Sequence, residues 1–238
     1  MLKVGVVLSG CGHLDGSEIH EAVLTLLALD RAGAEVVCLA PNIEQKSVVN
    51  HLTQHPTESL RNVLEESARI ARGNVWDVAE IDASELDALV LPGGYGAAKN
   101  LCDFAAQGAE AKVQAGVRKL VREMHAARKP IGAWCIAPSV LAAALKEAHV
   151  KLTIGEDPGT ARLLESMGAT HVVCPVDEMR VDEVNRIVTT PAYMYDARIG
   201  EVASGIEKAV AQLLAFVFGL RAKGRAEGYH ELPKPALL

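Results

Sequence analysis

One cysteine of the sequence lies at the kind of strand-to-helix turn that can make a thiol reactive. Residues 129–134 have the pattern of a buried strand and 136–142 that of a helix start, so Cys135 lies at the junction. Small residues on both sides permit the sharp, strained turn of a nucleophile elbow. Free N–H groups at a helix N-terminus favour thiolate over thiol, which predicts a lowered pKa for Cys135. The alternative is an inert buried cysteine, but the end of the strand at which α/β sheets bind ligands favours a reactive one.

A glycine-rich loop follows a second buried strand. Residues 87–91 are apolar, and the loop after them contains the pair Gly93-Gly94. Paired glycines let the backbone turn tightly and expose N–H groups. Together with the N–H of Ile136, these groups are candidate donors to an oxyanion that forms beside Cys135. The pair is neither a dinucleotide fingerprint nor a phosphate-binding loop, and an ordinary turn is the alternative.

Polar and titratable side chains crowd the loop after the first strand and the helix that follows it. They are Ser9, Cys11, His13, Asp15, Ser17, Glu18, His20 and Glu21. We expect Asp15 or Ser17 to cap the helix and Glu18 to complement its dipole. For Glu21, position alone indicates a solvent-facing side chain. His20 is a candidate base, and Cys11 is a second thiol that no helix start follows directly.

Composition narrows the function classes. The formal net charge is −6 and no basic stripe occurs, which argues against a nucleic-acid partner. We identify no apolar run long enough to cross a bilayer, and we expect no membrane partner. The first residues lead directly into a strand pattern without a leader, which predicts a cytoplasmic location. The five cysteines are odd in number and lack C-x-x-C spacing, so we expect free thiols and no metal site.

Short apolar runs alternate with amphipathic stretches along the chain, which predicts a mostly parallel sheet with helices on both faces. We expect one domain over 1–238, an extra lobe or helix within 42–80, and a tail at 224–238 that is poorly ordered. The last two strands are expected to pair as an antiparallel edge addition. The expected strands are 3–8, 35–40, 87–91, 130–134, 150–154, 171–174, 179–182 and 186–190. The expected helices are 17–32, 57–72, 108–127, 136–146, 159–167 and 197–221.

Several motifs together resemble one known superfamily. The segments are 92–101 (PGGYGAAKNL), 134–138 (WCIAP), 8–12 (LSGCG) and 15–27 (DGSEIHEAVLTLL), and the likeness extends from residue 3 to about 217. The first two resemble the ThiJ/PfpI superfamily, a branch of the class I glutamine amidotransferase-like fold. The last two resemble its ElbB group, which is linked by name to isoprenoid biosynthesis.

The resemblance implies a flavodoxin-like three-layer sandwich and a cofactor-free glyoxalase that acts on a small 2-oxoaldehyde, methylglyoxal or glyoxal. It implies that Glu21 hydrogen-bonds Cys135 and that the N–H groups of Gly94 and Ile136 hold the oxyanion. It also makes a homodimer the expected assembly. The candidates for the substrate pocket are Gly93, Ser9, Cys11, His20 and Asn100.

The sequence departs from the superfamily at one position. Many members carry a histidine after the strand that follows the elbow helix, whereas residues 151–157 contain none. The proton shuttle is therefore expected to be Glu21, or an unidentified group such as His20, Glu156 or Asp157. Two other roles stay open: a regulatory or partner-binding module with vestigial activity, and a redox-sensing thiol protein.

Overall fold

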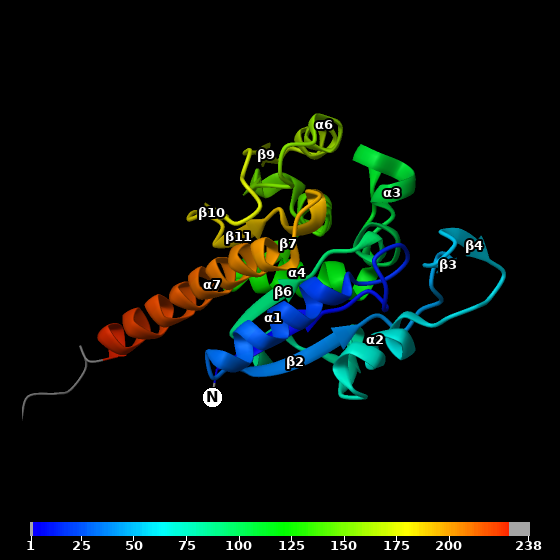
Figure 1. The fold of residues 1–238 in the computed structure, drawn as a ribbon. Coiled ribbons are helices and arrows are strands. Elements are labelled where there is room, and N and C mark those ends of the chain that lie inside the picture. The colour runs from blue at the N-terminus through cyan, green and yellow to red at the C-terminus, as the bar shows by residue number, and fades with distance from the viewer. Residues whose placement is uncertain (1, 229–238) are drawn as a thin grey trace, which may run out of the picture.

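The structure is a computed structural model that describes the backbone of residues 2–228 and the side chains up to residue 220. Its centre is a seven-stranded sheet in the order β10-β11-β7-β6-β1-β2-β5 (Figure 1). All neighbours in this sheet pair in parallel except β10 and β11, which are antiparallel. The strands of the central sheet are β1 (Lys3–Val7), β2 (Glu35–Ala40), β5 (Val75–Asp77), β6 (Ala88–Leu91), β7 (Ile131–Trp134), β10 (Arg180–Asp182) and β11 (Ile187–Thr190).

Helices cover both faces of the sheet, which gives the expected flavodoxin-like three-layer arrangement. One face carries α1, α2 and α7, and the other carries α4 and α5. Strands β6, β7 and β11 are buried along their whole length, because helices exclude water from both sides. The helices are α1 (Ile19–Arg31), α2 (Val63–Ala71), α3 (Phe104–Gln107), α4 (Ala115–Ala126), α5 (Pro138–Ala144), α6 (Pro158–Ser166) and α7 (Ile199–Gly228).

Two small sheets lie outside the central one. Strands β3 (Val48–Asn50) and β4 (His55–Thr57) form a hairpin that extends away from the central sheet (Figure 1). The hairpin and α2 are the extra lobe expected within 42–80. Strands β8 (Lys151–Leu152) and β9 (Thr170–His171) pair only with each other. The prediction that 150–154 and 171–174 are full strands was wrong, because only two residues of each pair.

The prediction that the last two strands of the chain form an antiparallel edge addition is partly confirmed. β10 and β11 are antiparallel neighbours, which confirms the hairpin. However, β11 is not an edge strand, since it also pairs in parallel with β7 and lines up Thr190 with Trp134. This register matters for function because it brings the chain after β11 to the same edge of the sheet as Cys135.

Two helices begin later than the sequence pattern predicts. The helix expected from residue 57 begins at Val63, because 55–57 form β4 and the Asn62 side chain accepts the N–H groups of the first turn. The helix expected from residue 108 begins at Ala115, where Gln114 is the cap. In both cases the capping side chain accepts hydrogen bonds from N–H groups of the first turn, which fixes the residue at which the helix begins.

Helix α7 has a segment, Ile199–Leu220, that is long and apolar enough to cross a membrane by length and composition. The expectation that no such run exists was therefore wrong. The apolar character has a local cause, since Val202, Ile206 and Leu213 are buried in the core beside α1 and β11. Of the tail 224–238, residues 224–228 continue α7, and the remainder lies outside the described residues.

A buried hydrogen-bond chain ties α1 to the elbow strand. The indole N–H of Trp134 donates to the Thr25 hydroxyl oxygen at 2.9 Å, and that hydroxyl donates to the Glu21 carbonyl at 2.7 Å. All three residues are fully buried. These two hydrogen bonds therefore fix the start of α1 relative to the end of β7, where the candidate site lies.

Removal of the Thr25 hydroxyl should test this link. Thr25→Val keeps the side-chain shape but leaves the buried indole N–H without an acceptor, so we expect the free energy of unfolding to fall by ~1–3 kcal/mol. Thr25→Ser retains the hydroxyl and loses one methyl group, which should cost about 1 kcal/mol. Urea denaturation measures both values. Equal stabilities of the wild-type protein and the Thr25→Val variant would contradict the assigned role.

Candidate active site

The thiol of Cys135 lies on a strained turn directly after β7. Its φ is +56°, a left-handed conformation that is unfavourable for residues with a side chain. The Cys135 N–H donates to the Thr190 carbonyl at 3.0 Å, and the Ala137 N–H donates back to the Trp134 carbonyl at 2.9 Å. These bonds from two strand ends hold the turn, which confirms the predicted nucleophile elbow.

Glu21, in the first turn of α1, faces this thiol from within the protein. Its carboxyl is fully buried and hydrogen-bonds the Cys135 sulfur. One carboxyl oxygen, Oε2, accepts the Gly93 N–H at 2.8 Å, and the other, Oε1, accepts the Tyr193 N–H at 3.3 Å. Glu21 therefore joins the segments that follow β6, β7 and β11, contrary to the solvent-facing position that its place in the helix alone indicated.

The loop after β6 brings backbone N–H groups to the sulfur. The N–H groups of Gly94 and Ile136 both hydrogen-bond Cys135. A side chain at position 93 would collide with the Cys135 Cβ and lie 2.7 Å from Glu21 Oε2, so only glycine allows this approach. Gly94 has a φ of +92° and also packs on the backbone of residues 16–18. The two predicted oxyanion donors therefore lie together at the thiol.

Burial dominates the electrostatics of the acid and the thiol. Desolvation, followed by the charge of Glu18, raises the pKa of Glu21 to about 8. Desolvation, followed by the charge of Glu21, raises the pKa of Cys135 well above its usual value. The N–H groups of Gly94 and Ile136 oppose this shift but do not reverse it. Near neutral pH the pair therefore retains its protons, because neither anion is solvated and the two would repel each other.

The prediction of a lowered Cys135 pKa was therefore wrong. Helix α5 begins only at Pro138, with Ala137 as its cap residue, so Cys135 precedes the helix rather than lying in its first turn. The favourable field of a helix terminus decays within about a turn. The cost of burying a thiolate beside a carboxyl group is the larger effect here.

A pocket of about 550 Å³ opens onto the thiol. Cys135 is one of its lining residues and has an exposed fraction of 7%. The imidazole Nδ1 of His20 and the hydroxyl of Tyr193 are hydrogen-bonded at 3.0 Å in its wall. The lining residues are His13, Glu18, His20, Gly94, Tyr95, Ala98, Phe104, Ala105, Cys135, Ile136, Thr160, Tyr193 and Met194. The candidate nucleophile is therefore part of the wall of a pocket rather than enclosed in the core.

Of the five predicted pocket residues, only His20 lines this pocket. Gly93 lies just behind the thiol and holds Glu21. Ser9 and Asn100 are structural: the Ser9 N–H donates to the Ser17 hydroxyl at 2.8 Å, and the Asn100 amide donates to the Ser9 and Asp15 carbonyls at 2.9 Å each. The prediction that Gly93, Ser9 and Asn100 line the pocket was therefore wrong.

Cys11 is also outside the pocket, contrary to the prediction. It lies half-buried in the loop after β1, where its backbone forms an isolated parallel β-bridge with that of Ser17. Burial and then the charge of Glu66 raise the pKa of the Cys11 thiol. The loop therefore supplies a second thiol that does not line the pocket of Cys135.

The structure also sorts the acids near the site. Glu18, rather than Asp15 or Ser17, is the cap of α1, and its Oε2 accepts the Glu21 N–H at 2.7 Å. Asp157 caps α6 by accepting the Thr160 N–H at 2.6 Å. Asp157 and its neighbour Glu156 are exposed and do not line the pocket. Neither is placed to shuttle protons at the thiol, which leaves Glu21 as the acid nearest to it.

Sequence reasoning missed the contribution of Tyr193. The residue follows β11 in a short turn in which buried Ala192 has a φ of +46°. This second strained residue aims the Tyr193 N–H at Glu21 and its hydroxyl at His20. The available signal was the position of the segment, since the chain after a parallel strand reaches the same sheet edge as Cys135.

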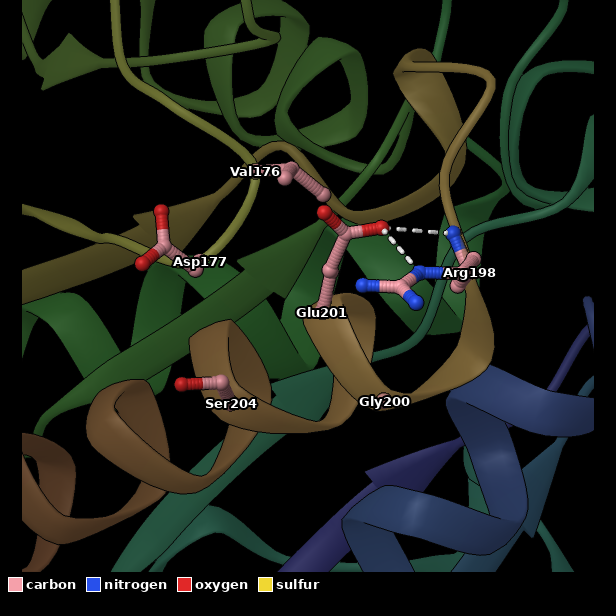
Figure 2. A pocket seen from close by; sticks show the side chains of 6 residues that line it. All are labelled: Val176, Asp177, Arg198, Gly200, Glu201 and Ser204. Carbon is pink, nitrogen blue, oxygen red and sulfur yellow. Dashed lines mark hydrogen bonds and ion pairs between the residues drawn. The ribbon is translucent and has the colours of Figure 1, made fainter.

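A second hollow, of about 690 Å³, lies beside the start of α7 (Figure 2). Its residues are Val176, Asp177, Arg198, Gly200, Glu201 and Ser204. Arg198 is occupied, because its backbone N–H and its guanidinium both donate to Glu201 Oε2. The lining of this hollow contains no thiol or imidazole, so the chemistry that the described residues can perform concentrates in the Cys135 pocket. Across all the residues that the structure describes, no group of three or more His, Cys, Asp or Glu side chains is suited to hold a metal ion.

The topology and the site define a class of protein: a mostly parallel α/β sandwich with a cysteine on a nucleophile elbow that faces a buried glutamate. A family model described as the DJ-1/PfpI family matches residues 11–153, which is more than half of the chain. The chain belongs to the DJ-1/PfpI family, in agreement with the resemblance stated from the motifs.

The chain is similar in sequence to individual relatives over most of its length. It is 44% identical over 222 residues to the mitochondrial ES1 protein homolog of Rattus norvegicus, covering 89% of this chain and 83% of that protein. Identity is also 44% to the mitochondrial glutamine amidotransferase-like class 1 domain-containing protein 3 of Homo sapiens, with coverages of 89% and 82%. A crystal structure of an isoprenoid biosynthesis protein with an amidotransferase-like domain from Ehrlichia chaffeensis is 44% identical. Its TM-score is 0.87, covering 91% of this chain and 100% of that one.

The comparisons overturn one expectation. The relatives from Rattus norvegicus, Homo sapiens and Danio rerio are all named as mitochondrial proteins. The expectation of a cytoplasmic location was therefore wrong. It depended on the first residues of the sequence, whereas the similarity to these relatives extends over most of the chain.

The raised pKa of Glu21 predicts how stability depends on pH. Because the folded-state pKa, about 8, exceeds the ordinary value of 4.5, the folded state binds the extra proton between these values. Stability from this group is complete below pH 4.5 and is lost as the pH rises to 8, at about 1.4 kcal/mol per pH unit. Glu21→Gln cannot ionise and should lack this loss.

Urea denaturation of both proteins at pH 6, 7 and 8 measures the difference. We expect the wild-type protein to lose stability relative to the Glu21→Gln variant as the pH rises. Glu156→Gln, which removes an exposed acid outside the pocket, should follow the wild-type curve. Parallel curves for the wild-type protein and Glu21→Gln would show that Glu21 ionises normally.

Proposed function

We propose that the protein is a cofactor-independent glyoxalase, linked to isoprenoid biosynthesis, that converts methylglyoxal to lactate and glyoxal to glycolate. The supporting observation is that Cys135 lines the pocket while its sulfur hydrogen-bonds the Glu21 carboxyl and the N–H groups of Gly94 and Ile136. A nucleophile, an acid-base group and an oxyanion site within one pocket are the parts that this isomerisation requires. The link to isoprenoid metabolism derives from the name of the Ehrlichia chaffeensis protein.

The reaction begins with addition of sulfur to the aldehyde. The ionised form of Glu21 takes the Cys135 proton while the sulfur bonds to the aldehyde carbon. The carbonyl oxygen becomes an alkoxide near the Gly94 and Ile136 N–H groups and then accepts the proton back, giving a hemithioacetal. The pair carries the same single negative charge before and after the step, so no second charge is created in a site that solvates charge poorly.

An internal proton transfer completes the redox change. Glu21 removes the proton from the former aldehyde carbon to give an enediol, and a proton is returned to the neighbouring carbon. The first carbon is thereby oxidised to a thioester and the second is reduced to an alcohol, so no external oxidant or reductant is needed. Water cleaves the thioester, releases the 2-hydroxy acid and restores the thiol.

The redox-sensing alternative is less well supported by this geometry. Peroxide reacts with thiolates, so sensor cysteines have low pKa values and open access. Here the pKa of Cys135 is raised by burial and by Glu21. The regulatory or partner-binding alternative differs from the glyoxalase in requiring no turnover, and the following experiment separates the two.

Substitution of the two central residues should abolish or sharply reduce turnover. We expect Cys135→Ser to give no measurable lactate from methylglyoxal without glutathione, because a hydroxyl in this site is not activated. Glu21→Gln retains hydrogen-bonding capacity but cannot take a proton, so kcat should fall ~10²-fold or more. Lactate release, followed by chiral chromatography, gives both values.

Cys11→Ser is the matched control, since it removes a thiol outside the pocket and should retain wild-type turnover. Wild-type activity in Cys135→Ser would contradict the proposal. Negligible turnover by the wild-type protein would also contradict it and would favour the regulatory role.

A further inference from the structure

The pocket has room well beyond the thiol. Its volume of about 550 Å³ falls within the ~300–1,000 Å³ typical of sites for drug-sized ligands. Methylglyoxal is far smaller than such ligands and would leave most of the space to water. The apolar lining residues are Ala98, Phe104, Ala105, Ile136 and Met194. The size and this lining together indicate a substrate with an apolar group that extends away from the reacting carbonyl.

The imidazoles of His13 and His20 are the only basic side chains among the described residues that line the pocket. Among the described residues, its lining contains no lysine or arginine, and Glu18 is its only carboxylate. Lys99 is not among the lining residues: its Nζ lies 5.5 Å from the centroid of the Tyr95 ring and donates to the Leu14 carbonyl at 3.0 Å and to the Ser47 hydroxyl at 3.3 Å. Glu18 also lies near enough to Glu21 to affect its ionisation. An anionic substrate would therefore meet a carboxylate and find no fixed cation in the lining.

We propose that this pocket selects uncharged 2-oxoaldehydes that carry an apolar group larger than methyl, and that Glu18 discriminates against anionic ones. The proposal rests on the proposed glyoxalase function and names its substrate class. Burial of an aromatic or branched group contributes ~1.5–3 kcal/mol, which corresponds to at least a tenfold gain in kcat/KM. Glu18 also repels the carboxylate of the product, which favours its release into solvent.

The size preference can be tested by filling the pocket from its exposed edge. Ala105 lines the pocket on the short helix α3, whereas its neighbour Ala106 is exposed and outside the lining. We expect Ala105→Trp to lower the ratio of kcat/KM for phenylglyoxal to that for methylglyoxal about tenfold. Ala106→Trp, which adds the same side chain at the neighbouring position outside the pocket lining, should leave this ratio as in the wild-type protein.

The charge preference can be tested without turnover. Iodoacetamide and iodoacetate are alkylating agents of similar size, and the second is an anion. We expect Cys135 in the wild-type protein to react about tenfold more slowly with iodoacetate, relative to iodoacetamide, than free cysteine does. Peptide mass spectrometry measures both rates. Glu18→Gln retains an oxygen that can cap α1 and should largely restore the free-cysteine ratio, whereas Glu156→Gln should not.

The outcomes separate the two proposals. If the wild-type protein turns over neither aldehyde but alkylation shows the Glu18-dependent discrimination, the glyoxalase function fails and the charge selectivity of the pocket is retained. If turnover occurs but Ala105→Trp and Ala106→Trp give equal ratios, the size preference is overturned. If iodoacetate reacts with Cys135 at the free-cysteine ratio, or if Glu18→Gln and Glu156→Gln behave alike, the charge preference is overturned.

Discussion

The arrangement of the loops around the candidate site depends on one buried carboxyl group, that of Glu21. Glu21 joins three segments that follow different strands of the sheet: it hydrogen-bonds the Cys135 sulfur after β7, the Gly93 N–H after β6 and the Tyr193 N–H after β11. A buried polar group without partners costs free energy, so each of these bonds is needed once Glu21 lies inside. The loops therefore converge on one point, and the thiol is held beside a carboxyl group that can exchange its proton.

Much of the fold follows from local patterns in the sequence. The fully apolar strands 88–91 and 131–134 can only be stable with both faces covered, which predicts the parallel sheet and the position of Cys135 at a strand end. The late start of α2 was not predictable in the same way. It depends on β4, a strand of three exposed residues that has neither apolar alternation nor buried area to reveal it.

The candidate site shows a similar division. Cys135 and the glycine pair could be located from their turns, because backbone geometry restricts which residues occur there. The direction of the Cys135 pKa could not, since desolvation depends on every element packed around the sulfur and outweighed the local N–H groups. Tyr193 was missed for a related reason: its backbone N–H, which any residue possesses, makes the contact with Glu21.

The main chain supplies most of the fixed parts of the candidate site, and this has an evolutionary consequence. The N–H groups at positions 93, 94, 136 and 193 persist through most substitutions, whereas the walls of the pocket consist of side chains such as His13, Tyr95 and Ala105, all on exposed positions. Exposed positions tolerate exchange with little loss of stability. Homologous proteins can therefore diversify in what they accept while inheriting one chemical core, and shared ancestry is a better guide to the reaction type than to the compound transformed.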